Sequence, residues 1–144
     1  MNEAQDTLLQ LMQPAVRDGI LYKCVCVQFG VRDLAPAELW EMFDVRWAAL
    51  SEVRLDKGLE TFLMRDEADD RPSTVQLAAL DPAGHAIGGA RVHVAPLQLL
   101  GGFDAIQISR VGVSWVARGA GIGTHLVSKG LRVARALGVV MSIP

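Results

Sequence analysis

Hydrophobic residues recur along this chain with two different periods, and each period predicts one kind of element. Alternating apolar positions, rich in branched and aromatic side chains, predict strands. The predicted strands cover four stretches and a short fifth one at the end of the chain: 20–29, 75–80, 86–94, 105–115 and 139–143. The sequence Asp81-Pro82-Ala83-Gly84 predicts a turn between the second and third strands, which therefore form a hairpin.

Apolar residues three and four positions apart predict two long helices. The first begins at Pro36, a residue that suits the first turn of a helix. Its apolar stripe is Leu39, Phe43, Trp47 and Leu50. Arg46 falls inside this stripe, and we expect its side chain to reach solvent at the rim. The second helix covers 122–137 and is expected to end at Gly138.

Shorter elements complete the pattern. A capping-box sequence at Thr7 predicts a short helix that ends before Pro14, and we expect residues 1–19 to form an arm outside the main fold. A short helix is predicted around 60–65, followed by an acidic loop over 66–70. Gly88-Gly89 interrupts a predicted strand and indicates a bulge or a close approach of another backbone. The element order predicts a mixed α/β fold in one domain, residues 20–144.

The composition narrows the class of protein. Hydrophobic residues make up 51% of the chain, and with its 14 glycines the apolar content exceeds the roughly 45–50% of soluble domains. The excess suggests apolar surface that lies against a partner or a ligand. No uncharged apolar run approaches the roughly 18 residues of a membrane helix. The acidic, polar start resembles no signal peptide, so we expect a cytoplasmic protein without a membrane partner.

The spacing of the cysteine and histidine residues does not predict a metal site. Cys24 and Cys26, two positions apart on a predicted strand, share one face and are expected to be core thiols. So few cysteines fit a reducing compartment. His85, His93 and His125 have no ligand spacing with other residues. We expect His93 at the rim of the core.

Charge is distributed unevenly along the chain. Residues 1–70 contain 14 acidic and 7 basic residues, whereas residues 105–144 contain five basic residues and no acidic one. The C-terminal part should therefore attract anions and the N-terminal half cations. The basic part is small and contains one aromatic residue, which argues against nucleic acid as a partner. A compact polyphosphate ligand fits better.

A glycine-rich turn is the strongest chemical signal. Residues 118–124, Arg-Gly-Ala-Gly-Ile-Gly-Thr, follow a predicted strand and open a helix. Glycines let backbone N–H groups converge, and a helix start adds unpaired donors, so the turn predicts an anion cradle. The dinucleotide fingerprint would need a glycine at Thr124, and the Walker A loop would need Gly-Lys-Ser/Thr. The R-x-x-G-x-G pattern of Arg118, Gly121 and Gly123 instead matches a coenzyme A pyrophosphate turn. A tight connection without a ligand is the alternative.

Residues 105–140 resemble the coenzyme A-binding motif of the GNAT superfamily of N-acyltransferases. Val111-x-Val113 before the turn, and Ala134 and Gly138 after it, carry the likeness. A weaker resemblance to the acyl-homoserine-lactone synthase branch rests on four short matches: Val45-Arg46, Glu67-x-Asp69-Asp70, Gly89-Ala90-Arg91-Val92 and Ser109-Arg110. The resemblance implies a mostly antiparallel sheet with flanking helices, ending at the fifth strand.

The resemblance also implies a ligand and a reaction. An acyl-coenzyme A, such as acetyl-coenzyme A, would lie against nine residues: Val111, Val113, Arg118, Gly119, Ala120, Gly121, Ile122, Gly123 and Thr124. The acyl group would pass directly to an amine drawn to the acidic half. The strand 105–115 offers no carboxylate as general base, so Glu60, Glu67 or Asp69 is expected to serve, or a water molecule. A solvated acidic face is the alternative interpretation of these residues.

Two departures from the family pattern bear on activity and assembly. The chain ends within the predicted fifth strand, and its single tyrosine, Tyr22, lies on the first strand, so the family's usual acid is missing and slow or absent catalysis is expected. A non-catalytic scaffold that keeps the coenzyme site is the alternative. The strand 139–143 would leave an open apolar edge, which predicts a homodimer through that strand. His125, Lys129 and Arg132 are expected to form a solvated helix surface.

Overall fold

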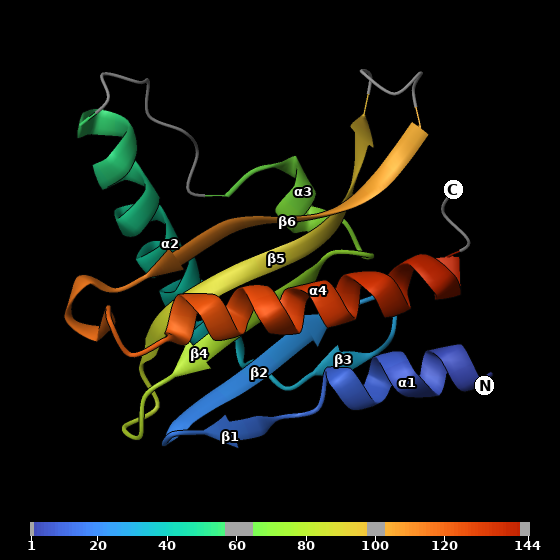
Figure 1. The fold of residues 1–144 in the computed structure, drawn as a ribbon, viewed down its shortest axis with the longest axis horizontal. Coiled ribbons are helices and arrows are strands. Elements are labelled where there is room, and N and C mark those ends of the chain that lie inside the picture. The colour runs from blue at the N-terminus through green and yellow to red at the C-terminus, as the bar shows by residue number, and fades with distance from the viewer. Residues whose placement is uncertain (1, 57–64, 98–102, 142–144) are drawn as a thin grey trace.

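The computed structural model describes residues 2–56, 65–97 and 103–141. These residues form one open sheet with helices on both of its faces (Figure 1). The strands are β1 (Ala15–Arg17), β2 (Ile20–Cys26), β3 (Val31–Arg32), β4 (Val75–Leu80), β5 (Ala86–Leu97) and β6 (Phe103–Val113). The helices are α1 (Glu3–Leu11), α2 (Pro36–Asp56), α3 (Glu67–Asp70) and α4 (Ile122–Met141). The predicted mixed α/β class and the mostly antiparallel sheet are confirmed.

The sheet has the order β1-β2-β4-β5-β6, with every neighbouring pair antiparallel and β3 paired to β2. All six residues of the central strand β4 are buried. Leu77 lies in the core beneath α4, whereas Leu80 lies in the core beneath α2. The Gly84 N–H donates to the Asp81 carbonyl at 2.9 Å, which confirms the predicted hairpin turn between β4 and β5.

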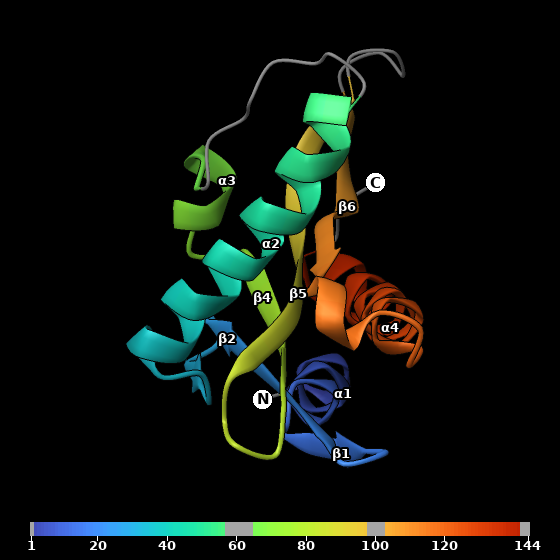
Figure 2. The same cartoon turned by 90° about the vertical axis from the view of Figure 1, so that its left-hand side faces the viewer.

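Helices cover the sheet in two layers (Figure 2): α2 and α3 lie over one face, and α4 and α1 lie over the other. Leu8 and Met12, from α1 and its end, are fully buried in the same apolar cluster as the core face of α4. The N-terminal segment therefore packs as part of the main core, and not as the separate arm that the sequence suggested for residues 1–19. The α1 helix also begins earlier than predicted, because the Asn2 side chain caps it while Thr7 lies within it.

The C-terminal helix differs most from the sequence prediction. The α4 helix runs without a break through Gly138 and continues to Met141. The predicted helix end at Gly138 is wrong, and so is a strand over residues 139–141; residues 142–144 lie outside the described part of the chain. The fold therefore has no described strand at 139–143, and the predicted homodimer loses the strand edge on which it rested. A homodimer stays a prediction without that basis.

A β-bulge interrupts the pairing of β5 with β6. Arg91 pairs with Ser109 and Gly89 pairs with Gly112, so two residues of β6 stand opposite one residue of β5. Arg110, inside the bulge, has a φ of 52°, a left-handed conformation that a non-glycine residue rarely adopts. Before the bulge, Ile108 lies against Gly130 of α4; after it, Val113 lies against Gly123 of α4. Before the bulge the even-numbered residues of β6 therefore face α4, and after it the odd-numbered residues do.

The register shifts of β5 against β4 and β6 confirm the bulge expected at Gly88-Gly89, and α2 also packs closely on this part of the sheet. A Cβ added to Gly89 would clash with the Met42 side chain of α2, and one on Gly112 would lie 3.0 Å from the Arg46 Cα. Only glycine lets α2 pack this closely on β5 and β6. These contacts bring the middle of α2 directly over the bulge.

Other predictions have mixed outcomes. Cys24 and Cys26 are free and buried in the same cluster, as expected. The acidic stretch predicted as a loop contains the short helix α3, whose Asp66 N-cap forms a capping box with Asp69. The helix predicted at 60–65 falls mostly on residues 57–64, which lie outside the described residues. No helix in the described part of the chain is long and apolar enough to cross a membrane.

Candidate functional site

The predicted glycine turn lies between β6 and α4. A short 3₁₀ helix, Trp115–Ala117, leads from the strand into it. Gly119 and Gly121 have φ values of 89° and 77°, which glycine adopts without strain. A Cβ added to either glycine would meet no heavy atom within 4 Å, so both face open space. The two glycines thus form the rim of a hollow rather than a packed connection.

Backbone donors line this hollow. The His125 N–H donates to the Gly121 carbonyl at 3.0 Å and closes the first turn of α4, so the N–H groups of residues 122–124 have no partner within the helix. The cavity measures about 360 Å³. Its lining is Val113, Ala117, Arg118, Gly119, Gly121, Ile122, Gly123 and Thr124. Unpaired donors and a helix N-terminus favour an anion here, as the sequence predicted. We call residues 118–124 the cradle.

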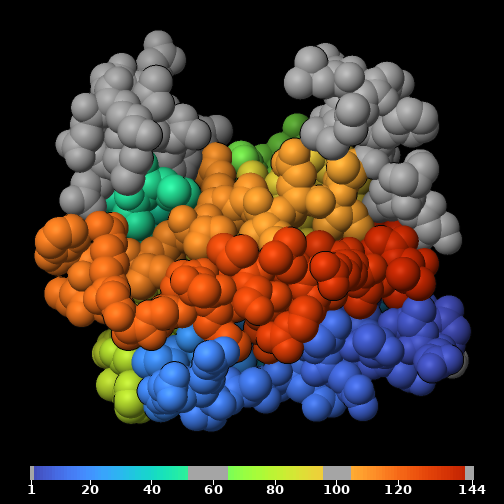
Figure 3. Space-filling model, viewed as in Figure 1, coloured from blue at the N-terminus to red at the C-terminus, as the bar shows by residue number. Residues whose placement is uncertain are grey.

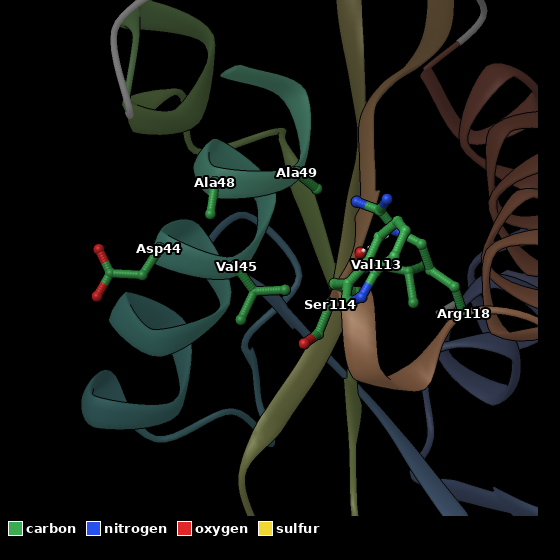
Figure 4. Close-up of a pocket in the computed structure, with 8 residues that line it drawn as sticks. Asp44, Val45, Ala48, Ala49, Val113, Ser114 and Arg118 are labelled. Carbon is green, nitrogen blue, oxygen red and sulfur yellow. Dashed lines mark hydrogen bonds between the residues drawn. The ribbon is translucent and has the colours of Figure 1, made fainter. Parts of the chain in front are cut away.

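A second cavity of about 330 Å³ adjoins the cavity of the cradle, and Val113 and Arg118 line both cavities. It lies between α2 and the end of β6 (Figure 4), where Val45 points toward Ser114 and the Asp44 carboxylate points away. Among the described strands, β6 pairs only with β5, so its outer edge is open. An extended ligand can therefore run from the cradle along this edge into the second cavity.

A buried charge network lies on the same side of the sheet as α2. Asp69 of α3 is its centre, with no exposed side-chain surface. Its Oδ1 accepts hydrogen bonds from Arg46 Nη2 at 3.0 Å and from Gln76 Nε2 at 2.9 Å. Its Oδ2 accepts from the Asp66 N–H at 3.0 Å and lies 3.1 Å from Arg91 Nη1. All four partners hold one carboxylate in place.

Asp66 extends the network to β6. Its carboxylate pairs with both terminal nitrogens of Arg91 and lies 3.0 Å from Arg110 Nη2. Arg91 Nε donates to Ser109 Oγ at 2.8 Å, and His93 Nε2 lies 2.9 Å from the same hydroxyl. The bulge is the cause of this arrangement, because it places Ser109 and Arg110 together on the α2 side of β6. The network therefore fixes the geometry of the strand beside the second cavity.

The network shifts the pKa values of its members. Burial alone would raise the pKa of Asp69, but the Arg46 charge and several hydrogen bonds outweigh it and lower that pKa. Asp66 shows the same balance, with Arg91 and Arg110 holding its pKa well below the usual range. Burial and the neighbouring Arg91 charge lower the pKa of His93. Both carboxylates are therefore ionised and His93 is neutral at physiological pH.

These shifts predict acid sensitivity. Because Asp66 and Asp69 have lower pKa values in the folded state than in the unfolded state, their stabilisation is fully present above the ordinary aspartate pKa of about 3.9. It is lost as pH falls below that value, since the unfolded chain binds protons first. Urea denaturation at several pH values should show the free energy of unfolding falling as the pH drops below about 4. A variant with Asp66→Asn should show a shallower fall; an equal fall would contradict the assignment.

Comparison with known proteins decides the family. The family model described as "Acetyltransferase (GNAT) family" matches residues 39–143, which include most of α2, the charge network and the cradle. The chain belongs to the GNAT acetyltransferase family. A search among curated proteins gives no significant match.

Solved structures agree with this GNAT assignment. An acyl-CoA N-acyltransferase from Pseudomonas aeruginosa is 25% identical with a TM-score of 0.58, covering 82% of this chain and 72% of that chain. ElaA from Escherichia coli is 19% identical with a TM-score of 0.60, covering 80% of this chain and 69% of that chain. The BH1408 protein from Bacillus halodurans, a tetramutant, is 14% identical with a TM-score of 0.55, covering 85% and 78%. The last two likenesses show the shared fold.

The structure describes two of the three candidate bases, Glu67 and Asp69. Glu60 lies outside the described residues. The Glu67 side chain is 89% exposed and lies 3.8 Å from Arg71, and it takes no part in the network. Asp69 is buried, and its lowered pKa makes it a weak proton acceptor. The base therefore stays a prediction, with Asp69 better suited to positioning Arg46 and Arg91 than to accepting a proton.

Sequence reasoning missed several members of the site. Arg46 is only 1% exposed, so the expectation that it reaches solvent is wrong. Asp66, Gln76 and Ser109 were not singled out for the site, although the Asp66-x-x-Asp69 spacing is itself a capping-box signal. His93 is 6% exposed and belongs to the network, with its Nδ1 buried and unpartnered among the described residues.

Tyr22 lies beside the cradle and not beside the network. Its ring packs edge-on against His125 with 4.3 Å between ring centroids. Together with Ala120, Gly121 and Ile122 it lines a small cavity of about 140 Å³. Burial raises the pKa of Tyr22, so its phenol stays protonated. No group of histidine, cysteine or acidic side chains among the described residues could hold a metal ion.

Proposed function

We propose that this GNAT protein transfers an acyl group from a coenzyme A thioester to an amine, and that acetyl-coenzyme A is its donor. The observation that carries the proposal is the continuity of the cradle with the second cavity at Val113 and Arg118 along the open edge of β6. One ligand with a pyrophosphate at one end and an extended thioester arm would fill both. The solved structure that is 25% identical bears the name acyl-CoA N-acyltransferase, which supports the same chemistry.

Each part of the site has a role in this reaction. The N–H groups of Gly119, Gly121 and Gly123 hold the pyrophosphate, and the backbone at Val111 and Val113 pairs with the thioester arm. A backbone N–H of β6 polarises the thioester carbonyl. The amine nitrogen attacks that carbon, the C–S bond breaks, and the amine proton passes to a base or to water while the thiolate takes up a proton. The charge network keeps the bulged strand in position for this step.

A thiol-release assay tests the proposal. Acetyl-coenzyme A and a panel of amines are incubated with the protein, and free thiol is measured over time. Amine-dependent thiol release is expected for at least one acceptor class, at a slow rate because the described residues present no well-placed base. A Gly121→Val variant should release no thiol above the uncatalysed rate. Binding of acetyl-coenzyme A without release for any amine would favour a non-catalytic coenzyme-binding scaffold.

A second candidate function has one specific observation in its favour. Arg46, Asp69, Arg91 and Arg110, which carry the resemblance to acyl-homoserine-lactone synthases, all lie in the charge network. Homoserine lactone therefore belongs in the amine panel, with acyl donors of several chain lengths. Mass spectrometry of the products would show acyl-homoserine lactone if this second candidate is right.

A further inference from the structure

A groove lies farther along α4 than the cradle, where the N-terminal segment packs against this helix (Figure 3). It measures about 510 Å³, larger than either cavity of the proposed acyl-transfer site. Its polar lining consists of Gln10, Gln13, Arg17, His125, Lys129 and Arg132. No acidic side chain lines it. We call this cavity the basic groove.

Lys129 is the unusual member of the basic groove. It is only 7% exposed, so the expected solvated helix surface is wrong at this position. The α1 helix packs against α4 beside this groove. Lys129 forms no hydrogen bond or ion pair with any residue that the structure describes. No acidic side chain in the lining of the groove supplies a counter-charge for this ammonium, and a bound anion would supply one.

The other cations leave the groove positive. Arg17 Nη1 lies 2.9 Å from His125 Nδ1, which must therefore accept the hydrogen bond and carry no proton. Burial and the charge of Arg17 lower the pKa of His125, in agreement with a neutral ring. Arg17 also pairs with Asp18 at 3.8 Å, but both side chains are largely exposed and water weakens that pair. Arg132 forms no ion pair with the described residues, so the groove keeps a net positive charge.

We propose that the basic groove binds a phosphate-bearing small molecule, independently of the cradle. Two guanidinium groups and an ammonium match the oxygens of a phosphate, and the amides of Gln10 and Gln13 add neutral donors. The groove is larger than one phosphate needs and leaves room for an organic part. Lys129 follows Ile122 by seven residues, roughly 10 Å along the helix. The basic groove and the cradle cavity share no lining residue, so anions can be bound at both sites together.

Nuclear magnetic resonance with inorganic phosphate as the probe tests this proposal. Amide shifts of uniformly labelled protein are followed during titration, first without and then with saturating acetyl-coenzyme A. Phosphate should shift the amides of Gln10, Gln13 and Arg132 in both titrations. Lys129→Met, which keeps the apolar stem, should weaken this binding at least about tenfold. Arg135→Gln removes a charge from the same helix outside the groove and should leave the binding unchanged.

Three outcomes would overturn the proposal. The first is the absence of phosphate-induced shifts at the groove residues. The second is their disappearance when acetyl-coenzyme A is present, since the coenzyme would then occupy the groove itself. The third is an equal effect of Arg135→Gln and Lys129→Met, which would indicate attraction by net charge alone. Because the first titration needs no coenzyme, failure of the groove remains distinguishable from failure of the proposed acyl transfer. Arg132→Gln, an exposed substitution, repeats the test if Lys129→Met does not fold.

Discussion

Gly121→Val should lower the affinity for acetyl-coenzyme A about a hundredfold while the protein remains folded. Gly121 has a φ of 77°, which a β-branched residue adopts only with strain, and its missing Cβ faces the space where the ligand would lie. The valine side chain would displace the ligand. The strained backbone would also point the N–H groups of the cradle away from the pyrophosphate. Hydrogen bonds to charged groups contribute about 1.5–3 kcal/mol each. Loss of one or two of them should lower affinity about a hundredfold, as isothermal titration calorimetry would measure.

Gly138→Ala is the matched control for this substitution. Gly138 lies inside α4, the helix that Gly121 precedes, and its added Cβ would lie at an ordinary 3.6 Å from Ile106. Alanine is preferred to glycine inside a helix, so this variant should bind acetyl-coenzyme A normally and unfold at an equal or higher temperature. If Gly121→Val binds as tightly as Gly138→Ala, the coenzyme site is not the cradle.

Asp69→Ala should lower the free energy of unfolding by about 3–5 kcal/mol, because it leaves the buried Arg46 guanidinium without its counter-charge. Arg46 and Arg91 both lie against this carboxylate, and both side chains are almost fully buried. Gln76 and the Asp66 N–H would lose their acceptor as well. Urea denaturation measures the effect directly. The expected loss in the free energy of unfolding is large because an unpaired charge inside a protein is strongly destabilising.

Glu67→Ala provides the comparison on the same short helix. Glu67 is 89% exposed and its nearest cation, Arg71, lies 3.8 Å away. Exposed pairs contribute about 0–1 kcal/mol, so this variant should keep nearly all of the stability. If Asp69→Ala proves no more damaging than Glu67→Ala, the network does not stabilise the fold.

The cradle and most strands could be predicted from the sequence because their signals are local. Gly119 and Gly121 encode a backbone conformation directly, and the nearly continuous apolar run over 75–80 encodes a buried strand. The strand β1 gave no such signal, since all three of its residues are exposed. Its formation depends on pairing with β2, which lies beyond a two-residue turn.

The charge network could not be predicted from one residue at a time. An arginine in an apolar stripe usually reaches solvent, and the counter-charge of Arg46 lies 23 positions away in the sequence. Asp69 of α3 comes into contact with Arg46 of α2 only when both helices pack on the same face of the folded sheet. The predicted buried face of this helix also differs slightly from the observed one. Met42 and Arg46 are buried, whereas Trp47 of the predicted apolar stripe is 38% exposed.

The end of α4 shows how a local signal can be overruled. Gly138 followed by Val139 and Val140 predicts a helix stop and a strand, because glycine and branched residues disfavour helix. These penalties amount to about 1 kcal/mol for glycine and less for valine. Leu137, fully buried in the core beneath α4, anchors the preceding turn, and helical packing prevails through Met141.

The bulge at Arg110 has a consequence for how related sequences should be aligned. Upstream of it, even-numbered residues of β6 face α4, and downstream the odd-numbered ones do. A relative that lacks the bulge and is one residue shorter here would keep Val113 on the α4 side and Gly112 on the α2 side. A relative that lacks the bulge at equal length would need an inverted polar pattern after it. A single-residue gap beside Arg110 in an alignment therefore marks a change of architecture, and not a neutral difference in length.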